Sequence, residues 1–216
     1  MTHQAIMDLI RTTGVIAILR AKRPDQLLRA AEALHAGGIC AIEVALTTPG
    51  ALEVIAQAAA HFEGSGVAFG AGTVLDAESA RSAIQAGAQF IVAPNLKPAV
   101  IKACRRSAVP VLPGAYTPTE IVAAWEAGAD MVKVFPASVG GPGFIQALKS
   151  PLPQIELVPV GGVTLENAAA FIRAGASAVG VGSELVDAKT LASQAWDALA
   201  ERAGRFIAEV QRGRSE

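Results

Sequence analysis

The chain has 216 residues, of which 52% are hydrophobic, 5% aromatic and 17% charged. This length suits one domain over residues 1–216 and can bury a substantial core. The formal net charge of −1 gives no basic surface for nucleic acid or an anionic membrane, so neither partner is expected. The N-terminus lacks a secretory signal, and no apolar run approaches the roughly 20 residues of a membrane helix. We therefore expect a soluble, cytoplasmic protein.

Cysteines and histidines give no sign of a disulfide framework or a metal site. Cys40 and Cys104 are predicted to be buried free thiols, the first in a strand and the second in a helix. His3, His35 and His61 fall in the N-terminal segment or in predicted helices. None of them is placed to be a metal ligand.

Short runs rich in β-branched residues recur along the chain and predict eight strands. They cover residues 15–20, 40–46, 67–72, 90–94, 109–114, 131–136, 156–162 and 178–183. Between them lie Ala-rich stretches of helical periodicity, several of which end in Ala-Gly-Gly or Ala-Gly-Ala. Because glycine tolerates the left-handed conformation just past a helix, these tripeptides predict helix ends.

Eight strand–helix units predict an α/β fold, a single-domain (β/α)₈ TIM barrel, with a doubly wound open sheet as the alternative. Residues 2–12 are expected to form an extra N-terminal helix. Residues 190–211 are expected to form an amphipathic closing helix.

Charged residues inside the predicted strands indicate where chemistry takes place, because barrel sites gather at the C-terminal ends of the strands. Arg20 ends the first strand, Glu43 lies in the second and Lys133 lies in the sixth. Glu156 begins the seventh strand, at the opposite end of the barrel, and is interpreted as structural.

Lys133 gives the sharpest of these signals. Its apolar neighbours in 131–136 would desolvate the ammonium group and lower its pKa, which would provide a neutral amine as a nucleophile. Glu43 is the natural proton-transfer partner for such an amine. The alternative for the two residues is a structural ion pair without chemistry.

Two glycine-rich turns predict an anion site. Gly161-Gly162 follows the seventh strand, and Gly182-Ser183 ends the eighth. Turns at these two places in barrels commonly hold a phosphate on their backbone amides, although glycines there can also serve only to make tight turns. Thr47 and Thr73 would bring hydroxyl groups to the same face.

The chain resembles the bacterial 2-keto-3-deoxy-6-phosphogluconate aldolase / 4-hydroxy-2-oxoglutarate aldolase family over nearly its whole length. The resemblance rests on several blocks in one order: IEVAL at 42–46, GAGTVLD at 70–76, AGAQFIVAPN at 86–95, PGAYTPTE at 113–120, VKVFPAS at 132–138, VPVGGV at 158–163 and GVGSELV at 180–186.

The resemblance implies a class I aldolase in which Lys133 forms a Schiff base with pyruvate and Glu43 is the general acid/base. No metal or other cofactor is implied, because the iminium polarises the substrate as a Lewis acid would. The resemblance also implies a homotrimer. The resemblance further implies that Arg20 and Thr73 bind the pyruvate carboxylate and that Pro94 and Phe135 form walls of the pocket. It implies phosphate contacts from Gly161, Gly162 and Ser183, with Gly182 beside them.

The chain departs from the family pattern at Thr47, where many members carry Arg. Carboxylate binding would then fall to Arg20, Thr73 and backbone amides, and substrate preference stays open. Tyr116 either shapes the pocket mouth or lies on the surface. Two alternative activities stay open, on the 6-phosphogalactonate epimer or on unphosphorylated 4-hydroxy-2-oxoglutarate. A third alternative is a non-catalytic barrel that binds a phosphorylated ligand or serves as an assembly scaffold.

Overall fold

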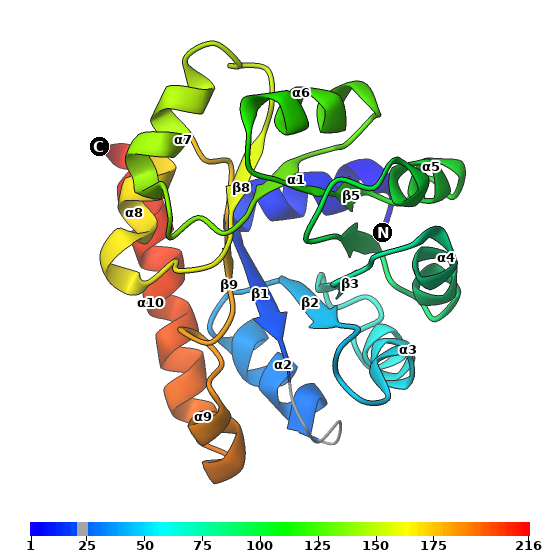
Figure 1. Ribbon diagram of the computed structural model, residues 1–216. Coiled ribbons are helices and arrows are strands. Elements are labelled where there is room, and N and C mark those ends of the chain that lie inside the picture. The colour runs from blue at the N-terminus through cyan, green and yellow to red at the C-terminus, as the bar shows by residue number, and fades with distance from the viewer. Residues whose placement is uncertain (21–25) are drawn as a thin grey trace.

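The computed structural model describes residues 1–20 and 26–216, in which parallel strands alternate with helices (Figure 1). The strands are β1 (Val15–Leu19), β2 (Ala41–Ala45), β3 (Ala68–Gly72), β4 (Phe90–Val92), β5 (Val111–Leu112), β6 (Gly114–Ala115), β7 (Val132–Val134), β8 (Leu157–Pro159) and β9 (Val179–Val181). The helices are α1 (His3–Thr13), α2 (Leu27–Ala36), α3 (Ala51–His61), α4 (Ala77–Gln85), α5 (Pro98–Arg106), α6 (Pro118–Glu126), α7 (Gly141–Lys149), α8 (Leu165–Arg173), α9 (Ala188–Ser193) and α10 (Trp196–Ser215).

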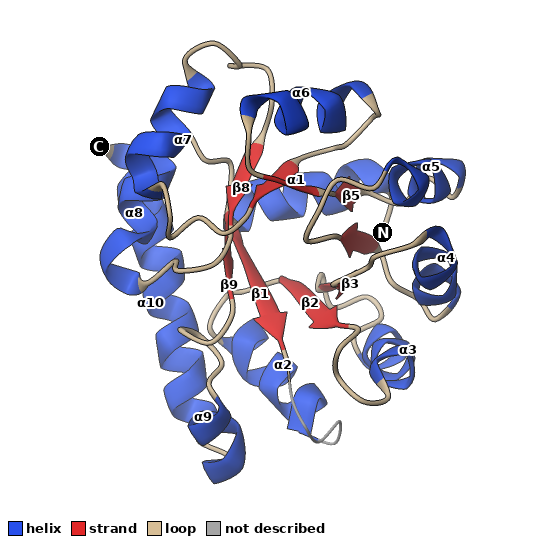
Figure 2. Cartoon of the chain, in the orientation of Figure 1, coloured by secondary structure: helices blue, strands red, loops and turns tan. Residues whose placement is uncertain are grey.

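The strands close into the predicted (β/α)₈ barrel. One run of neighbours is β5-β4-β3-β2-β1-β9 and the other is β6-β7-β8, and all of the pairings are parallel. A parallel bridge between Val160 and Gly180 joins the β8 side to β9. Figure 2 shows the helices surrounding the strands. The eight predicted strand regions and the N-terminal helix are therefore confirmed.

Two boundaries differ from the sequence prediction. The fifth predicted strand is divided into β5 and β6 at Pro113, which has no N–H to donate to the ladder. Its carbonyl still accepts a 2.9 Å hydrogen bond from the Lys133 amide. The predicted closing helix 190–211 is wrong as a single element, because Gln194 adopts a left-handed φ of 53° that separates α9 from α10.

The apolar core has two layers. One layer fills the space between the outer faces of the strands and the helices. The other fills the barrel interior, where Ile6, Met7 and Ile10 of α1 pack against inward side chains of the strands. Because Arg11 of α1 also pairs with Glu156 just before β8, α1 covers the end where the strands begin. The predicted structural role of Glu156 fits this contact.

The predicted glycine helix ends are confirmed at Gly38, Gly87, Gly128 and Gly175, whose φ angles lie between 91° and 103°. Cys104 is buried in α5, as predicted, and burial together with Asp130 raises the pKa of its thiol to about 12. Cys40 is only half-buried and precedes β2, so its prediction as a buried strand residue is wrong. No helix in the described ranges has the length and apolar character to cross a bilayer.

Candidate active site

The interior face of the barrel carries most of the residues predicted for the site. Ala41 and Met131 belong to the interior core. Because side chains alternate along a strand, Glu43 and Lys133 face the same interior space, two residues closer to the C-terminal rim. The same alternation, continued to and past the strand ends, places five further predicted residues at this rim: Arg20, Pro94, Phe135, Gly162 and Gly182.

Glu43 is held inside the barrel by β2. Only 1% of the residue is exposed, and within the described residues its Oε1 atom has no hydrogen-bond partner. Burial raises the pKa of this carboxyl, and the positive charges of Lys133 and Arg20 partly offset the effect. A buried, unpaired carboxyl oxygen is costly in a purely structural residue. Glu43 therefore has the surroundings of a proton-transfer group.

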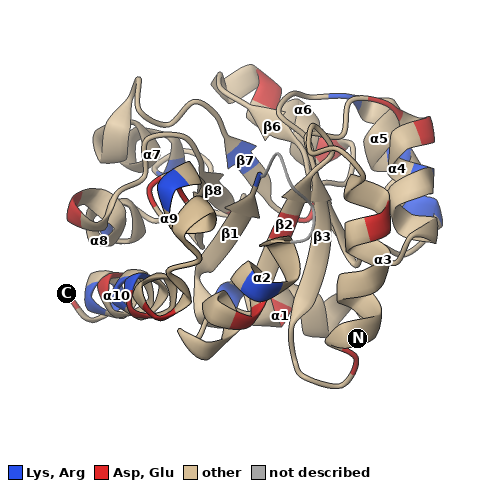
Figure 3. Cartoon of the chain, turned by 90° about the horizontal axis from the view of Figure 1, so that it is seen from below, with Lys and Arg blue, Asp and Glu red and all other residues tan. Residues whose placement is uncertain are grey.

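Lys133 lies on β7 and is 3% exposed. Burial lowers the pKa of its amine; the charge of Glu43 opposes this shift and that of Arg20 adds to it. Its Nζ atom lies 5.3 Å from the ring centroid of Phe135. Lys133 is the only charged residue of β7, and Glu43 is the only one of β2. They are therefore the blue band on β7 and the red band on β2 in Figure 3. The pair therefore combines an amine of lowered pKa with a carboxyl of raised pKa.

Arg20 directly follows β1 and has an exposed side chain. Its guanidinium lies close to Gly182, just after β9. A Cβ atom added to this glycine would be 4.0 Å from one of the guanidinium nitrogens. From this position its charge acts on both Glu43 and Lys133. The structure thus brings Arg20 to the predicted region and also close to the glycine turn after β9.

The turn after β8 adopts a backbone shape that only glycine takes readily. Gly161 and Gly162 have φ angles of 86° and 82°, both left-handed. A Cβ on Gly161 would lie 3.1 Å from the ring of Phe135, and one on Gly162 would lie 2.5 Å from Cβ of Ser138. The ring of Phe135, which is 39% exposed, therefore lies close both to Lys133 and to this turn.

The turn after β9 presents a second set of backbone amides. The carbonyl of Gly182 accepts hydrogen bonds from Leu185 and Val186, which folds residues 182–186 into one tight turn. Ser183 lies in this turn with an exposed side chain. Backbone amides at the start of such a turn suit an anion.

Two other predicted residues, Thr73 and Thr47, lie at the same end of the barrel. Thr73 directly follows β3 with a left-handed φ of 60°, a strained conformation for a threonine that is found preferentially at functional sites. Thr47 is exposed two residues after β2, and Pro94 is half-buried two residues after β4. Tyr116 is half-buried and stacks on Phe144 of α7, with ring centroids 5.0 Å apart.

Glycines on β3 form a part of the site that sequence reasoning missed. A Cβ on Gly72 would lie 1.7 Å from Glu43 Oε1, and one on Gly70 would lie 2.4 Å from the ring of Phe90. A glycine inside a strand is the signal that could have found them, because it often marks a close approach of another group.

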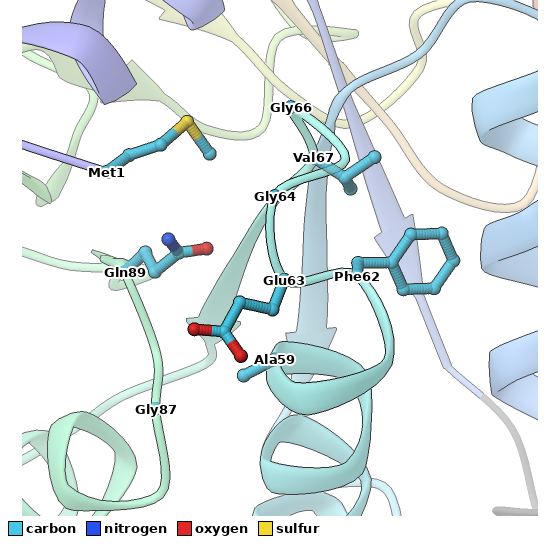
Figure 4. Close-up of a pocket in the computed structure, with 9 residues that line it drawn as sticks. All are labelled: Met1, Ala59, Phe62, Glu63, Gly64, Gly66, Val67, Gly87 and Gln89. Atoms are coloured by element: carbon cyan, nitrogen blue, oxygen red, sulfur yellow. The ribbon is translucent and has the colours of Figure 1, made fainter.

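A separate cavity of about 390 Å³ lies at the opposite end of the barrel. It is bounded by the chain before β3 and before β4, with Met1 across from it (Figure 4). The Oε1 atom of Gln89 in its wall accepts a hydrogen bond from the Phe69 amide. This cavity contains neither Glu43 nor Lys133, so it is not the candidate site.

Comparisons with known proteins point to one family. The sequence profile of KDPG and KHG aldolase matches residues 6–202. A 2-dehydro-3-deoxy-6-phosphogalactonate aldolase of Escherichia coli is 39% identical over 89% of this chain and 92% of its own length. A 2-dehydro-3-deoxy-phosphogluconate aldolase of Treponema pallidum is 38% identical over 87% of this chain and 89% of its own. The crystal structure of the Legionella pneumophila KDPG aldolase, with pyruvate captured as a covalent carbinolamine, is 28% identical with a TM-score of 0.86, over 92% of this chain and 96% of that one.

Proposed function

The chain belongs to the KDPG and KHG aldolase family of carbon–carbon lyases, and from this premise we propose that it cleaves 2-keto-3-deoxy-6-phosphogluconate into pyruvate and glyceraldehyde 3-phosphate by Schiff-base chemistry. One observation carries the proposal. A buried lysine of lowered pKa and a buried glutamate of raised pKa share the interior face of the barrel. The covalent pyruvate carbinolamine of the Legionella relative supports the same chemistry.

In the proposed reaction, the neutral Lys133 amine attacks the C2 ketone of the substrate. Glu43 donates a proton to the carbinolamine oxygen, and water leaves to give an iminium. Glu43 then takes the proton of the C4 hydroxyl, the C3–C4 bond breaks, and its electron pair moves onto the iminium to form an enamine. The aldehyde departs, C3 of the enamine is protonated, and hydrolysis releases pyruvate and the free amine.

The rest of the site would hold the two anionic ends of the substrate. Arg20 and Thr73 bind the carboxylate, with Thr47 where many relatives carry Arg. Gly161, Gly162 and Ser183 present backbone amides and a hydroxyl to the phosphate, as helix starts do in many phosphate sites. Pro94 and Phe135 form walls of the pocket. Within this proposal the enzyme needs no metal, and it acts as a cytoplasmic homotrimer.

The C4 epimer is a second candidate substrate, because the Escherichia coli relative with 39% identity is named for the phosphogalactonate compound. Pyruvate release is measured from both epimers and from 4-hydroxy-2-oxoglutarate, with Lys133→Ala as the control. We expect release from at least one phosphorylated epimer by the wild-type protein and none by the variant. If a folded wild-type protein released pyruvate from none of the three compounds, a binding or scaffold role would replace this proposal.

A further inference from the structure

The glycine turn after β8 is fixed from outside by a side chain of α8. The Nδ2 atom of Asn167 donates a 2.8 Å hydrogen bond to the carbonyl of Gly162. Its Oδ1 atom accepts a 2.8 Å hydrogen bond from the Thr164 amide. These two partners fix which end of the Asn167 side-chain amide is the oxygen and which is the nitrogen, since a backbone N–H can only donate and a carbonyl can only accept. Asn167 therefore links the start of α8 to the turn.

The neighbouring carbonyl of the turn is fixed from the other side. Gly161 accepts a 2.8 Å hydrogen bond from the Ser138 amide, in the segment after β7. A trans peptide is planar, with its N–H opposite its C=O. Holding the Gly161 carbonyl therefore directs the Gly162 amide away from Ser138. Holding the Gly162 carbonyl in the same way directs the Val163 amide away from Asn167.

These amides are free to bind a ligand. Within the described ranges, the amides of Gly162 and Val163 donate to no acceptor, whereas the Gly161 amide belongs to the parallel bridge between Val160 and Gly180. Glycine pairs with two left-handed residues are flexible, so their amides converge on an anion only if the peptide planes are held. The two carbonyl contacts hold them.

We propose that Asn167 is a positioning residue for the substrate phosphate: it holds the peptide plane between Gly162 and Val163, and with it the Val163 amide, without touching the phosphate itself. This inference rests on the proposed function, which places the phosphate at this turn. It predicts that loss of the Asn167 contact weakens phosphate binding and leaves the chemistry at Lys133 intact.

The test compares Asn167→Ala, which loses both contacts, with Asn167→Asp, which keeps an acceptor for the Thr164 amide and loses the donor to Gly162. Thr2→Ala is the matched control, because it removes a helix cap from α1 at the far end of the barrel. Binding of inorganic phosphate is measured by calorimetry. KM and kcat are measured for the phosphorylated substrate and for 4-hydroxy-2-oxoglutarate.

We expect both Asn167 variants to bind inorganic phosphate about five- to tenfold more weakly than wild type, with a matching rise in KM for the phosphorylated substrate. Turnover of 4-hydroxy-2-oxoglutarate and all properties of Thr2→Ala should stay within about twofold. Wild-type phosphate affinity in folded Asn167→Ala would overturn the inference, as would an equal loss on both substrates. The phosphate titration needs no turnover, so failure of the proposed reaction can be told apart from failure of this inference.

Discussion

Gly72 and Glu43 share one space inside the barrel, because a Cβ on Gly72 would lie 1.7 Å from Glu43 Oε1. The two residues stand on the paired strands β3 and β2, where Gly72 is level with Ala45. The absence of a side chain on Gly72 is thus what allows the Glu43 carboxyl to lie over β3. The position of the proposed acid/base depends on a residue that has no chemistry of its own.

Gly72→Ala should lower kcat by about 100-fold while the protein stays folded, because the added methyl displaces the carboxyl that transfers protons. Steady-state kinetics and circular dichroism check this. Adding Glu43→Asp, with its shorter side chain, should restore part of the activity. Gly143→Ala is the control, since a Cβ at that position meets nothing within 4 Å. Full activity in Gly72→Ala would show that the Glu43 position is not critical.

Arg20→Met should move the acid limb of the pH–rate profile to higher pH. The Arg20 charge adds to the lowering of the Lys133 pKa, so its removal lets the ammonium form persist to higher pH. The rate of pyruvate adduct formation, measured as a function of pH, reports the limb. An unchanged limb would mean that Arg20 does not act on Lys133.

Glu43→Gln should be more stable than the wild type, by a margin that grows as the pH rises. In the unfolded chain Glu43 ionises near its ordinary pKa of 4.5, whereas in the folded protein burial raises the pKa. The folded wild type therefore holds the proton above pH 4.5 and loses stability as the pH rises from there through the folded pKa. The glutamine variant has no such loss. Urea unfolding over this pH range should give a variant–wild-type difference that grows with pH; a constant difference would contradict the raised pKa.

Thr47→Arg should lower the KM for the keto acid by about three- to tenfold, because an exposed cation is added to the loop after β2 at the mouth of the barrel. Thr47→Gln, which adds a neutral polar side chain, is the control. Kinetics at two salt concentrations separate charge from size. If the glutamine variant gave the same change, the effect would not come from a carboxylate–cation contact.

The strand pattern and the two charged residues could be predicted from the sequence because both follow local rules. Runs of β-branched residues gave the eight strand regions, and Glu43 and Lys133 stood out as charged residues inside two of these apolar runs. The break between α9 and α10 could not be predicted, since Gln194, whose left-handed φ ends α9, is neither glycine nor proline.

Features set by strand register or by the path of a loop in space were also beyond prediction. The close approach of the Glu43 carboxyl to Gly72 depends on the register of β2 with β3. The Asn167 contact depends on how α8 returns toward the turn before it. The half-buried state of Cys40 depends on where β2 begins, one residue later than the run of apolar residues indicates.

Lys133 is proposed to form a Schiff base with pyruvate, and this covalent bond can be trapped directly. The protein is incubated with pyruvate and borohydride, digested and mapped by mass spectrometry, with Lys133→Ala as the control. We predict a reduced pyruvyl adduct on Lys133 alone, absent from the variant although other lysines remain. A folded wild-type protein with no adduct, or with the adduct on another lysine, would contradict the account.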